Sequence, residues 1–272
     1  MNRKNFIENE IKIVNKQGKQ VSFIQNYVQN KLDEIRDKLK RESKPIWILV
    51  LKARQEGCSA KIEADWLTDC TLKKNINAVV ISHEKESTKR LLRRVHYYID
   101  NANLQIPTEK SSEYEISFPT TNSWFYLGTA GSVAFGRGDT IHRVHLSEWA
   151  FYRDDSVVDG ILQSVPMDGE VIAESTANGF GNRFQTEWDR AIRGESKFYP
   201  LFFSWSDNPE YQIANTSLSE NEITEEEQIL KDKFRLTIPQ IAWRREKMKE
   251  FPTKEQFYQE YPLTPDEAFI YT

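Results

Sequence analysis

Short runs rich in apolar residues alternate with amphipathic stretches along most of the chain. The runs have the length of buried strands and lie at residues 46–51, 78–82, 141–147, 171–175 and 199–204. Between them, apolar residues three and four positions apart predict helices over 25–41, 59–74 and 84–103. Strands that alternate with helices favour an α/β fold with a mainly parallel sheet and helices on both faces.

Other segments extend this picture. Residues 114–118 and 124–127 predict two strands joined by a turn, and residues 16–19 predict another turn. After about residue 207 the composition changes, and residues 222–260 are charged, helical in pattern and without glycine. We therefore expect a core over 1–207 and a small helical subdomain over 208–272, whose prolines at 262 and 265 look like the approach to a linker.

Composition narrows the functional classes. Apolar residues make up 39% and charged residues 29% of the 272 residues, as in globular proteins. A net charge of −4 means that any DNA contact must come from local patches or from parts of the protein outside this sequence. The longest apolar run, residues 46–51, is too short to span a membrane, and we see no secretion signal. Cys58 and Cys70 give no disulfide framework or zinc pattern, which suits a reducing cytoplasm.

The eight residues after the first buried strand have the frame of a phosphate-binding loop. They read Lys52-Ala53-Arg54-Gln55-Glu56-Gly57-Cys58-Ser59, against the pattern G-x-x-x-x-G-K-[ST]. Gly57 and Ser59 match the second glycine and the hydroxyl that binds Mg²⁺, but Cys58 stands at the lysine position. Because the phosphates still need a cation, we expect Lys52 or Arg54 to supply it, with loop N–H groups around the phosphates.

The strand at 141–147 leads into the sequence Leu146-Ser147-Glu148. Walker B strands end in two acids, one that holds Mg²⁺ through water and one that orients the attacking water. Ser147 stands in place of the first acid, so Ser59, Ser147 and Glu148 are the candidate metal-site residues and Glu148 is the candidate general base. The alternative is that Glu148 only caps the next segment, because an acid after a strand is common.

Two more segments fit a nucleotide site. Ser175 ends the strand at 171–175 and Thr176 follows it, at the sheet edge where ligands bind in open α/β folds. Both residues could sense the terminal phosphate. An ordinary Asn-Gly turn at 178–179 is the alternative. Gly136-Arg137-Gly138 presents an arginine that could neutralise a transferring phosphoryl group, unless Arg137 is simply a solvated surface residue.

With these motifs in this order, the chain resembles the N-terminal ATPase half of the large terminase subunit of tailed double-stranded DNA bacteriophages. The resemblance runs from about Val21 to Phe269. It is carried by the segments Lys52–Ser59, Leu146–Glu148, Ser175–Gly179 and Glu260–Phe269. It implies an α/β P-loop NTPase core of the RecA/ASCE type, plus a small helical lid subdomain.

The resemblance also implies roles and partners. ATP would be hydrolysed with Mg²⁺ to drive double-stranded DNA into a procapsid in the host cytoplasm. The portal protein and the small terminase subunit would be partners, and the chain would form a homo-oligomer, a pentamer by resemblance, on the portal but stay monomeric alone. Lys52 would be a displaced Walker A lysine, and Gln29 would read adenine. Ser175 and Thr176 would couple hydrolysis to movement. Arg137 would act in trans, at the nucleotide site of a neighbouring subunit.

Two departures from the family pattern stand out. Ser147 replaces the Walker B aspartate, which puts the coordination of Mg²⁺ in question, and we expect no nuclease half or nuclease activity in this chain. Two rival hypotheses remain. One is a fragment of a helicase-like translocase, which would need a second RecA-like domain. The other is a non-hydrolysing nucleotide- or DNA-binding scaffold that kept an inactive loop. Nucleotide titration followed by a turnover assay separates the last from an ATPase.

Overall fold

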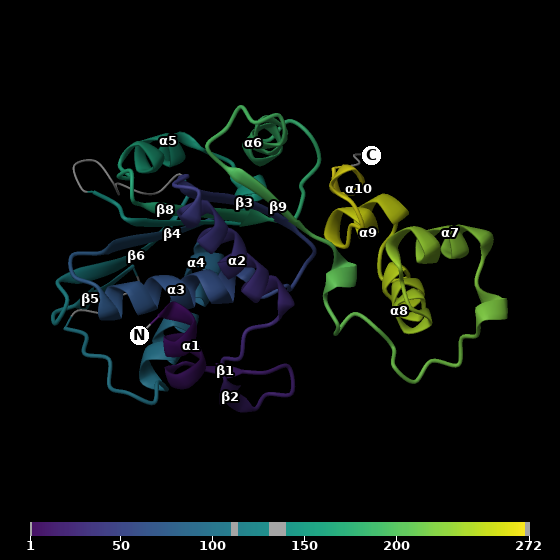
Figure 1. The fold of residues 1–272 in the computed structure, drawn as a ribbon, viewed down its shortest axis with the longest axis horizontal. Helices are drawn as coiled ribbons and strands as arrows, with labels where there is room; N and C mark the ends of the chain where they lie inside the picture. Colours follow the sequence, from purple (N-terminus) through teal and green to yellow (C-terminus); the bar gives the residue numbers. More distant parts are fainter. Residues whose placement is uncertain (1, 110–113, 131–139, 270–272) are drawn as a thin grey trace.

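A seven-stranded sheet forms the centre of the protein (Figure 1). The computed structural model describes residues 2–109, 114–130 and 140–269. The strand order is β5-β6-β4-β7-β8-β3-β9, and all neighbours pair in parallel except β5 and β6. The strands are β3 (Ile46–Lys52), β4 (Asn77–Ser82), β5 (Glu115–Phe118), β6 (Ser123–Thr129), β7 (Arg143–Ser147), β8 (Glu170–Ser175) and β9 (Tyr199–Phe203). The predicted α/β fold with a mainly parallel sheet is confirmed.

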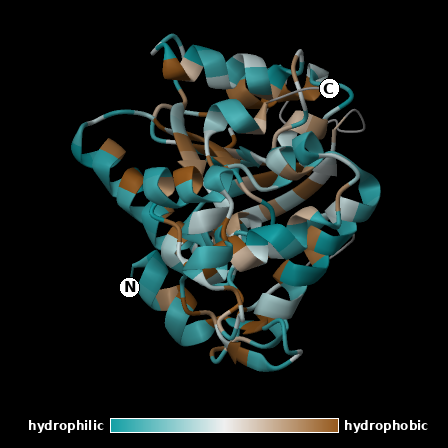
Figure 2. Ribbon diagram, turned by 90° about the vertical axis from the view of Figure 1, so that its right-hand side faces the viewer, coloured by the Kyte–Doolittle hydropathy of each residue, from teal (hydrophilic) through white to brown (hydrophobic). Residues whose placement is uncertain are grey.

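Helices cover both faces of the sheet. One layer contains α1 (Arg3–Glu10), α2 (Tyr27–Arg41), α3 (Cys58–Leu72) and α4 (Lys85–Asp100), and the other contains α5 (Ser156–Gln163) and α6 (Arg183–Ile192). Alternate residues of each strand face opposite layers: Ile48 and Val50 pack against the first, Leu49 and Leu51 against the second. Figure 2 shows the apolar residues gathered along the central strands, with hydrophilic residues on the outer sides of the helices.

The helices expected over 25–41, 59–74 and 84–103 are present to within three residues at each end. Two details differ from the sequence pattern. Tyr27 is one of the apolar positions in the helical pattern of α2 but is 54% exposed, because it is the first residue of that helix. The N-terminal segment, which reads as polar, forms α1 and a hairpin of β1 (Lys12–Val14) and β2 (Gln20–Ser22), with Gly18 in the predicted turn at φ +73°.

The apolar residues of helix α3 predict that one side of the helix is buried, but the structure buries other sides as well. Lys61, Glu63, Asp65 and Asp69 are all buried, because α1, α2 and α4 surround the helix. Each charge finds a partner: Lys61 Nζ contacts Asp65 Oδ1 at 2.5 Å, and Arg94 Nη1 contacts Glu63 Oε2 at 3.1 Å. Paired charges therefore replace an exposed polar face.

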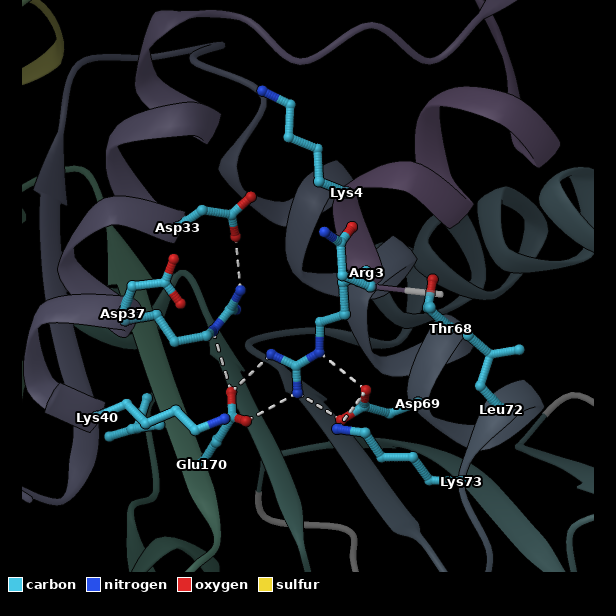
Figure 3. A pocket seen from close by; sticks show the side chains of 13 residues that line it. Arg3, Lys4, Asp33, Asp37, Lys40, Thr68, Asp69, Leu72, Lys73 and Glu170 are labelled. Carbon is cyan, nitrogen blue, oxygen red and sulfur yellow. Dashed lines mark hydrogen bonds and ion pairs between the residues drawn. The ribbon is translucent and has the colours of Figure 1, made fainter.

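An ion-pair network closes the edge of the sheet at which β8 begins. Figure 3 shows the Arg3 guanidinium between Asp69 and Glu170, with Nε to Asp69 Oδ1 at 2.8 Å and Nη1 to Glu170 Oε2 at 2.9 Å. Arg36 Nε lies 3.1 Å from Glu170 Oε2. Burial raises the pKa of Glu170, but the charges of Arg3 and Arg36 outweigh burial and lower it to about 2. These contacts tie α1 and α2 to the sheet.

The last part of the chain packs beside the β9 edge of the sheet (Figure 1). Its helices are α7 (Glu225–Phe234), α8 (Ile238–Met248), α9 (Lys254–Glu260) and α10 (Pro265–Ala268). The Trp243 ring stacks 4.6 Å from the Tyr211 ring and 4.9 Å from the Trp205 ring at the centre of an aromatic cluster. Ala53 belongs to the same cluster, so this helical part is packed directly onto the loop after β3.

In the described ranges, 2–109, 114–130 and 140–269, no helix has the length and apolar character needed to cross a membrane.

Candidate nucleotide site

A cleft of about 920 Å³ opens at the carboxyl ends of β3 and β7, which both pair in parallel with β8 between them. Its lining includes every predicted loop residue except the buried Ala53: Lys52, Arg54, Gln55, Glu56, Gly57, Cys58 and Ser59. Ser147, Glu148 and Thr176 line it too. The structure thus brings together residues up to 124 positions apart in the sequence, at the edge where ligands bind in open α/β sheets.

Lys52 is the buried cation of the cleft, with only 4% of its surface exposed. Its Nζ lies 3.1 Å from Glu148 Oε1 and 3.1 Å from Glu174 Oε2. Burial lowers the pKa of Lys52, but the two carboxylates outweigh it and raise the pKa well above its ordinary value. A lysine at the end of β3 that keeps its proton is suited to phosphate binding.

Glu148 turns its side chain into the cleft. Its backbone is left-handed, at φ +54° and ψ +48°, a conformation that non-glycine residues adopt at a cost and that clusters at functional sites. Its Oε2 accepts hydrogen bonds from Ser175 Oγ at 3.2 Å and from the Thr176 N–H at 3.3 Å. It stands at the N-cap of the 3₁₀ turn Trp149–Phe151, yet its side chain makes no capping hydrogen bond.

The amino end of α3 is left open toward the cleft. Gly57 is its N-cap at φ +77°, with no side-chain cap, and the first N–H groups of any helix lack partners within it. Such N–H groups suit an anion. A Cβ at Gly57 would lie 2.8 Å from Gln29 Nε2, so the positive φ favours glycine here and a larger residue would also displace the Gln29 amide.

Gln29 and Asn26 support the loop from behind. Gln29 Nε2 donates to the Gly57 carbonyl at 3.0 Å, and Asn26 Nδ2 donates to the Glu56 carbonyl at 3.1 Å. The same two side chains form the capping box of α2, which fixes their orientation. Gln29 is 5% exposed and does not line the cleft, so its adenine-reading role stays a prediction.

Arg54 and Glu56 connect the loop to the helical part of the chain. Arg54 Nη1 pairs with Glu260 Oε2 at 3.2 Å, and its side chain is 60% exposed. Glu56 is buried, and Asn208 Nδ2 donates to its Oε2 at 3.1 Å. Burial raises the pKa of Glu56 to about 8, against an opposing effect of Lys52. Burial also raises the pKa of the Cys58 thiol far above its ordinary range, so Cys58 is a small apolar residue here.

Glu174 of β8 is a site residue to which the sequence assigned no role. Its side chain is fully buried, and its Oε1 lies 2.7 Å from Ser59 Oγ, 3.0 Å from Ser147 Oγ and 3.2 Å from His145 Nε2. Burial raises its pKa, but Lys52 and His145 lower it well below its usual value. The sequence offers little signal for it, because Glu174 is followed by Ser175 at the polar end of the strand.

The oxygen donors around Glu174 fit Mg²⁺. Mg²⁺ usually takes one or two protein oxygens and completes its shell with waters and phosphate oxygens. Ser59 and Ser147 offer hydroxyl oxygens at the cleft, with Glu148 beside them. Within the described residues, no three His, Cys, Asp or Glu side chains gather in a group that could hold a metal ion. Arg137 lies outside the described residues.

Comparison with known proteins gives a result only at the level of structure. No protein-family model matches the chain, and a search of curated proteins found no match. The large terminase ATPase domain of Thermus phage P74-26 matches with a TM-score of 0.60 and 16% identity over 91% of this chain and 95% of that one. The large terminase of bacteriophage HK97 matches with a TM-score of 0.65 and 15% identity over 96% of this chain and 54% of that one.

A third match carries a bound nucleotide. The large terminase of another thermophilic bacteriophage, in complex with ATP-gamma-S, has a TM-score of 0.51 and 13% identity over 79% of this chain and 50% of that one. The chain therefore spans about half the length of the HK97 protein and of this third protein. With the parallel sheet and the cleft at the carboxyl ends of its strands, these matches show that the chain has the fold of the ATPase domain of phage large terminases.

Proposed function

We propose that the chain is a Mg²⁺-dependent ATPase and that it powers DNA packaging as part of a large terminase. The observation that carries the proposal is the meeting of Lys52 and Glu148. A buried lysine and an acid, 96 residues apart in sequence, face each other at 3.1 Å beside the open amino end of α3. Phosphoryl transfer needs a cation that binds the phosphates, backbone N–H groups around them and a group that positions the attacking water. Lys52, the start of α3 and Glu148 could supply these three parts.

Each residue then has a task. Lys52 Nζ binds the β- and γ-phosphates, and the N–H groups at the start of α3 surround them. Because Lys52 is paired with Glu148 here, phosphate binding would draw Lys52 away and free the Glu148 carboxylate to position water. Ser59 and Ser147 would hold Mg²⁺, which, when bound with the nucleotide, supplies neutralisation of charge on the phosphate oxygens.

Ser175 offers a route from hydrolysis to movement. Its Oγ bonds Glu148 Oε2 at 3.2 Å and accepts from the Ala150 N–H at 3.2 Å. A shift of Glu148 on loss of the γ-phosphate would thus reach the 3₁₀ turn after β7 through a single side chain. In the assembled motor this shift would act on double-stranded DNA at the portal, where the chain would assemble as a homo-oligomer with the small terminase subunit.

The test is an ATP hydrolysis assay on the purified chain with Mg²⁺. We expect turnover in the wild type, and a loss of turnover in Glu148→Gln with nucleotide binding retained. A chain that binds ATP with no turnover, alone or assembled on portals, would instead be the non-hydrolysing scaffold. For the packaging role, Glu148→Gln subunits should bind portals and fail to fill procapsids.

A further inference from the structure

Glu174 stands where two neighbouring elements present hydroxyl groups to it. In the parallel pairing of β7 with β8, Ser147 lies directly opposite Glu174, and Ser59 reaches the same carboxylate from the first turn of α3. Both hydroxyl oxygens lie within 3.0 Å of the one atom Glu174 Oε1. No part of Glu174 is exposed, so its carboxylate lies behind the two serines as seen from the cleft.

The direction of these hydrogen bonds determines whether the Ser59 and Ser147 hydroxyls present protons or lone pairs to the cleft. An ionised carboxylate only accepts, so the Ser59 and Ser147 hydroxyls must donate to Glu174. Each hydroxyl has a single proton, which leaves only lone pairs on the cleft side of both oxygens. Hard oxygen lone pairs are the ligands that Mg²⁺ takes. A partner that fixes a ligand's orientation in this way acts as the outer shell of a metal site.

The charge of Glu174 is a second reason to expect a cation beside Ser59 and Ser147. Ser147 occupies the position at which a Walker B strand carries its first acid, and it has no charge. The carboxylate of Glu174 lies 3.0 Å from Ser147 Oγ, on the adjacent strand. Lys52 pairs with Glu174 but also with Glu148, so one lysine charge is shared between two carboxylates. Among Lys52, Glu148 and Glu174, the carboxylates therefore exceed the lysine by one negative charge, and His145 leaves this balance unchanged when its imidazole is neutral.

We propose that Glu174 takes the place of the missing acid: from the neighbouring strand it orients the Ser59 and Ser147 oxygens and supplies the negative charge that holds the nucleotide's Mg²⁺. Glu174 is a positioning residue in this scheme, and the proposal rests on the Mg²⁺-nucleotide function proposed above. The competing explanation is structural, namely that Glu174 only pairs Lys52 and His145 inside the fold. The two differ in one measurable quantity, the gain in nucleotide affinity that the metal provides.

The experiment measures binding of a fluorescent ATPγS analogue by anisotropy, with Mg²⁺ and with EDTA, and Mn²⁺ affinity of the nucleotide complex by electron paramagnetic resonance. In Glu174→Gln, metal affinity should fall by about 10- to 100-fold. Binding in EDTA should be no weaker than in the wild type, because Lys52 loses a carboxylate that competes with phosphate. Glu174→Asp should recover part of the metal affinity.

Glu170→Gln is the matched control. Glu170 is also on β8, buried and ion-paired, but it lies at the opposite end of the strand. That variant should lose thermal stability and keep the wild-type difference between Mg²⁺ and EDTA. A folded Glu174→Gln protein with the wild-type difference, or with equal losses in Mg²⁺ and in EDTA, would overturn the role of Glu174 and leave the ATPase proposal standing.

A second variant covers the case in which Glu174→Gln does not fold. The exchange Ser147→Asp with Glu174→Ser moves the acid from β8 to β7 and keeps one acid and one hydroxyl in the pair. We expect its metal affinity to lie within about tenfold of the wild type. A folded exchange variant that gains nothing from Mg²⁺ contradicts the proposal. A wild-type chain that binds no nucleotide with or without Mg²⁺ overturns this inference and the proposed function together.

Discussion

Replacing Glu56 by glutamine should remove a large pH dependence of stability between pH 5 and pH 8. Burial raises the pKa of Glu56 from 4.5 to about 8 in the folded protein. The folded chain then keeps a proton that the unfolded chain has released, so the free energy of unfolding falls as pH rises through this range. With these two pKa values, the fall between pH 5 and pH 8 amounts to roughly 3 kcal/mol.

The assay is urea unfolding followed by tryptophan fluorescence at several pH values from 5 to 8. Glutamine has the shape of the protonated acid and still accepts from Asn208 Nδ2, so Glu56→Gln should lack the roughly 3 kcal/mol fall that the wild type shows. Glu225→Gln is the matched control, because Glu225 is exposed on α7, and it should follow the wild type. The contributions of other titrating groups to the pH dependence cancel in the difference between variant and wild type.

One result would refute this reasoning about Glu56. If the wild type and Glu56→Gln lose stability in parallel between pH 5 and pH 8, Glu56 is ionised throughout that range. Its charge would then be balanced by Lys52 to a greater extent than its burial implies.

Lys52→Ala should abolish ATP turnover and weaken nucleotide binding measured by anisotropy, because it removes the buried cation of the loop; near-normal turnover beside an inactive Arg54→Ala would assign that role to Arg54. Glu148→Gln should bind nucleotide and lose about 10²- to 10⁴-fold in turnover in a phosphate-release assay, whereas loss of binding as well would make Glu148 a structural residue or a metal ligand. Arg3→Ala should lower the urea-unfolding free energy by roughly 2 kcal/mol, since Glu170 loses one of its guanidinium partners. Because the ion pairs of Arg3 lie at the opposite end of β8 from the cleft, Arg3→Ala should leave nucleotide binding unchanged, and a folded variant with impaired binding would contradict this.

The sequence predicts most of the sheet because its central strands are short apolar runs and the helices between them have apolar residues at helical spacing. Strand limits agree to within two residues, and β5 and β6 pair as a hairpin as expected. The loop at 52–59 and Glu148 can be connected from the sequence because each follows a buried strand, and parallel strands end at one edge. The division of the chain at residue 207 and the roles of the individual site residues stay predictions.

Other features could not be inferred because their causes lie far apart in the sequence. Helix α1 has little apolar content, and Arg3 is held by Asp69 and Glu170, 66 and 167 residues away. The burial of α3 depends on charged partners from α2 and α4 rather than on its own pattern. Glu174 reads as the polar end of a strand, because nothing local shows that Ser59 and Ser147 meet at its carboxylate.

The pairing of β8 makes its length a chemical constraint. Glu174 and Ser175 are consecutive, so their side chains leave opposite faces of the sheet: Glu174 toward the hydroxyl of Ser59 on α3, and Ser175 toward Glu148. Deleting or inserting a single residue before them would exchange the two faces. A carboxylate would then lie where Ser175 Oγ now contacts Glu148, and the contacts of Glu174 with Ser59 and of Ser175 with Glu148 would be lost together. Sequences that diversify this protein should therefore change β8 by substitution and place their insertions and deletions in the connections on either side.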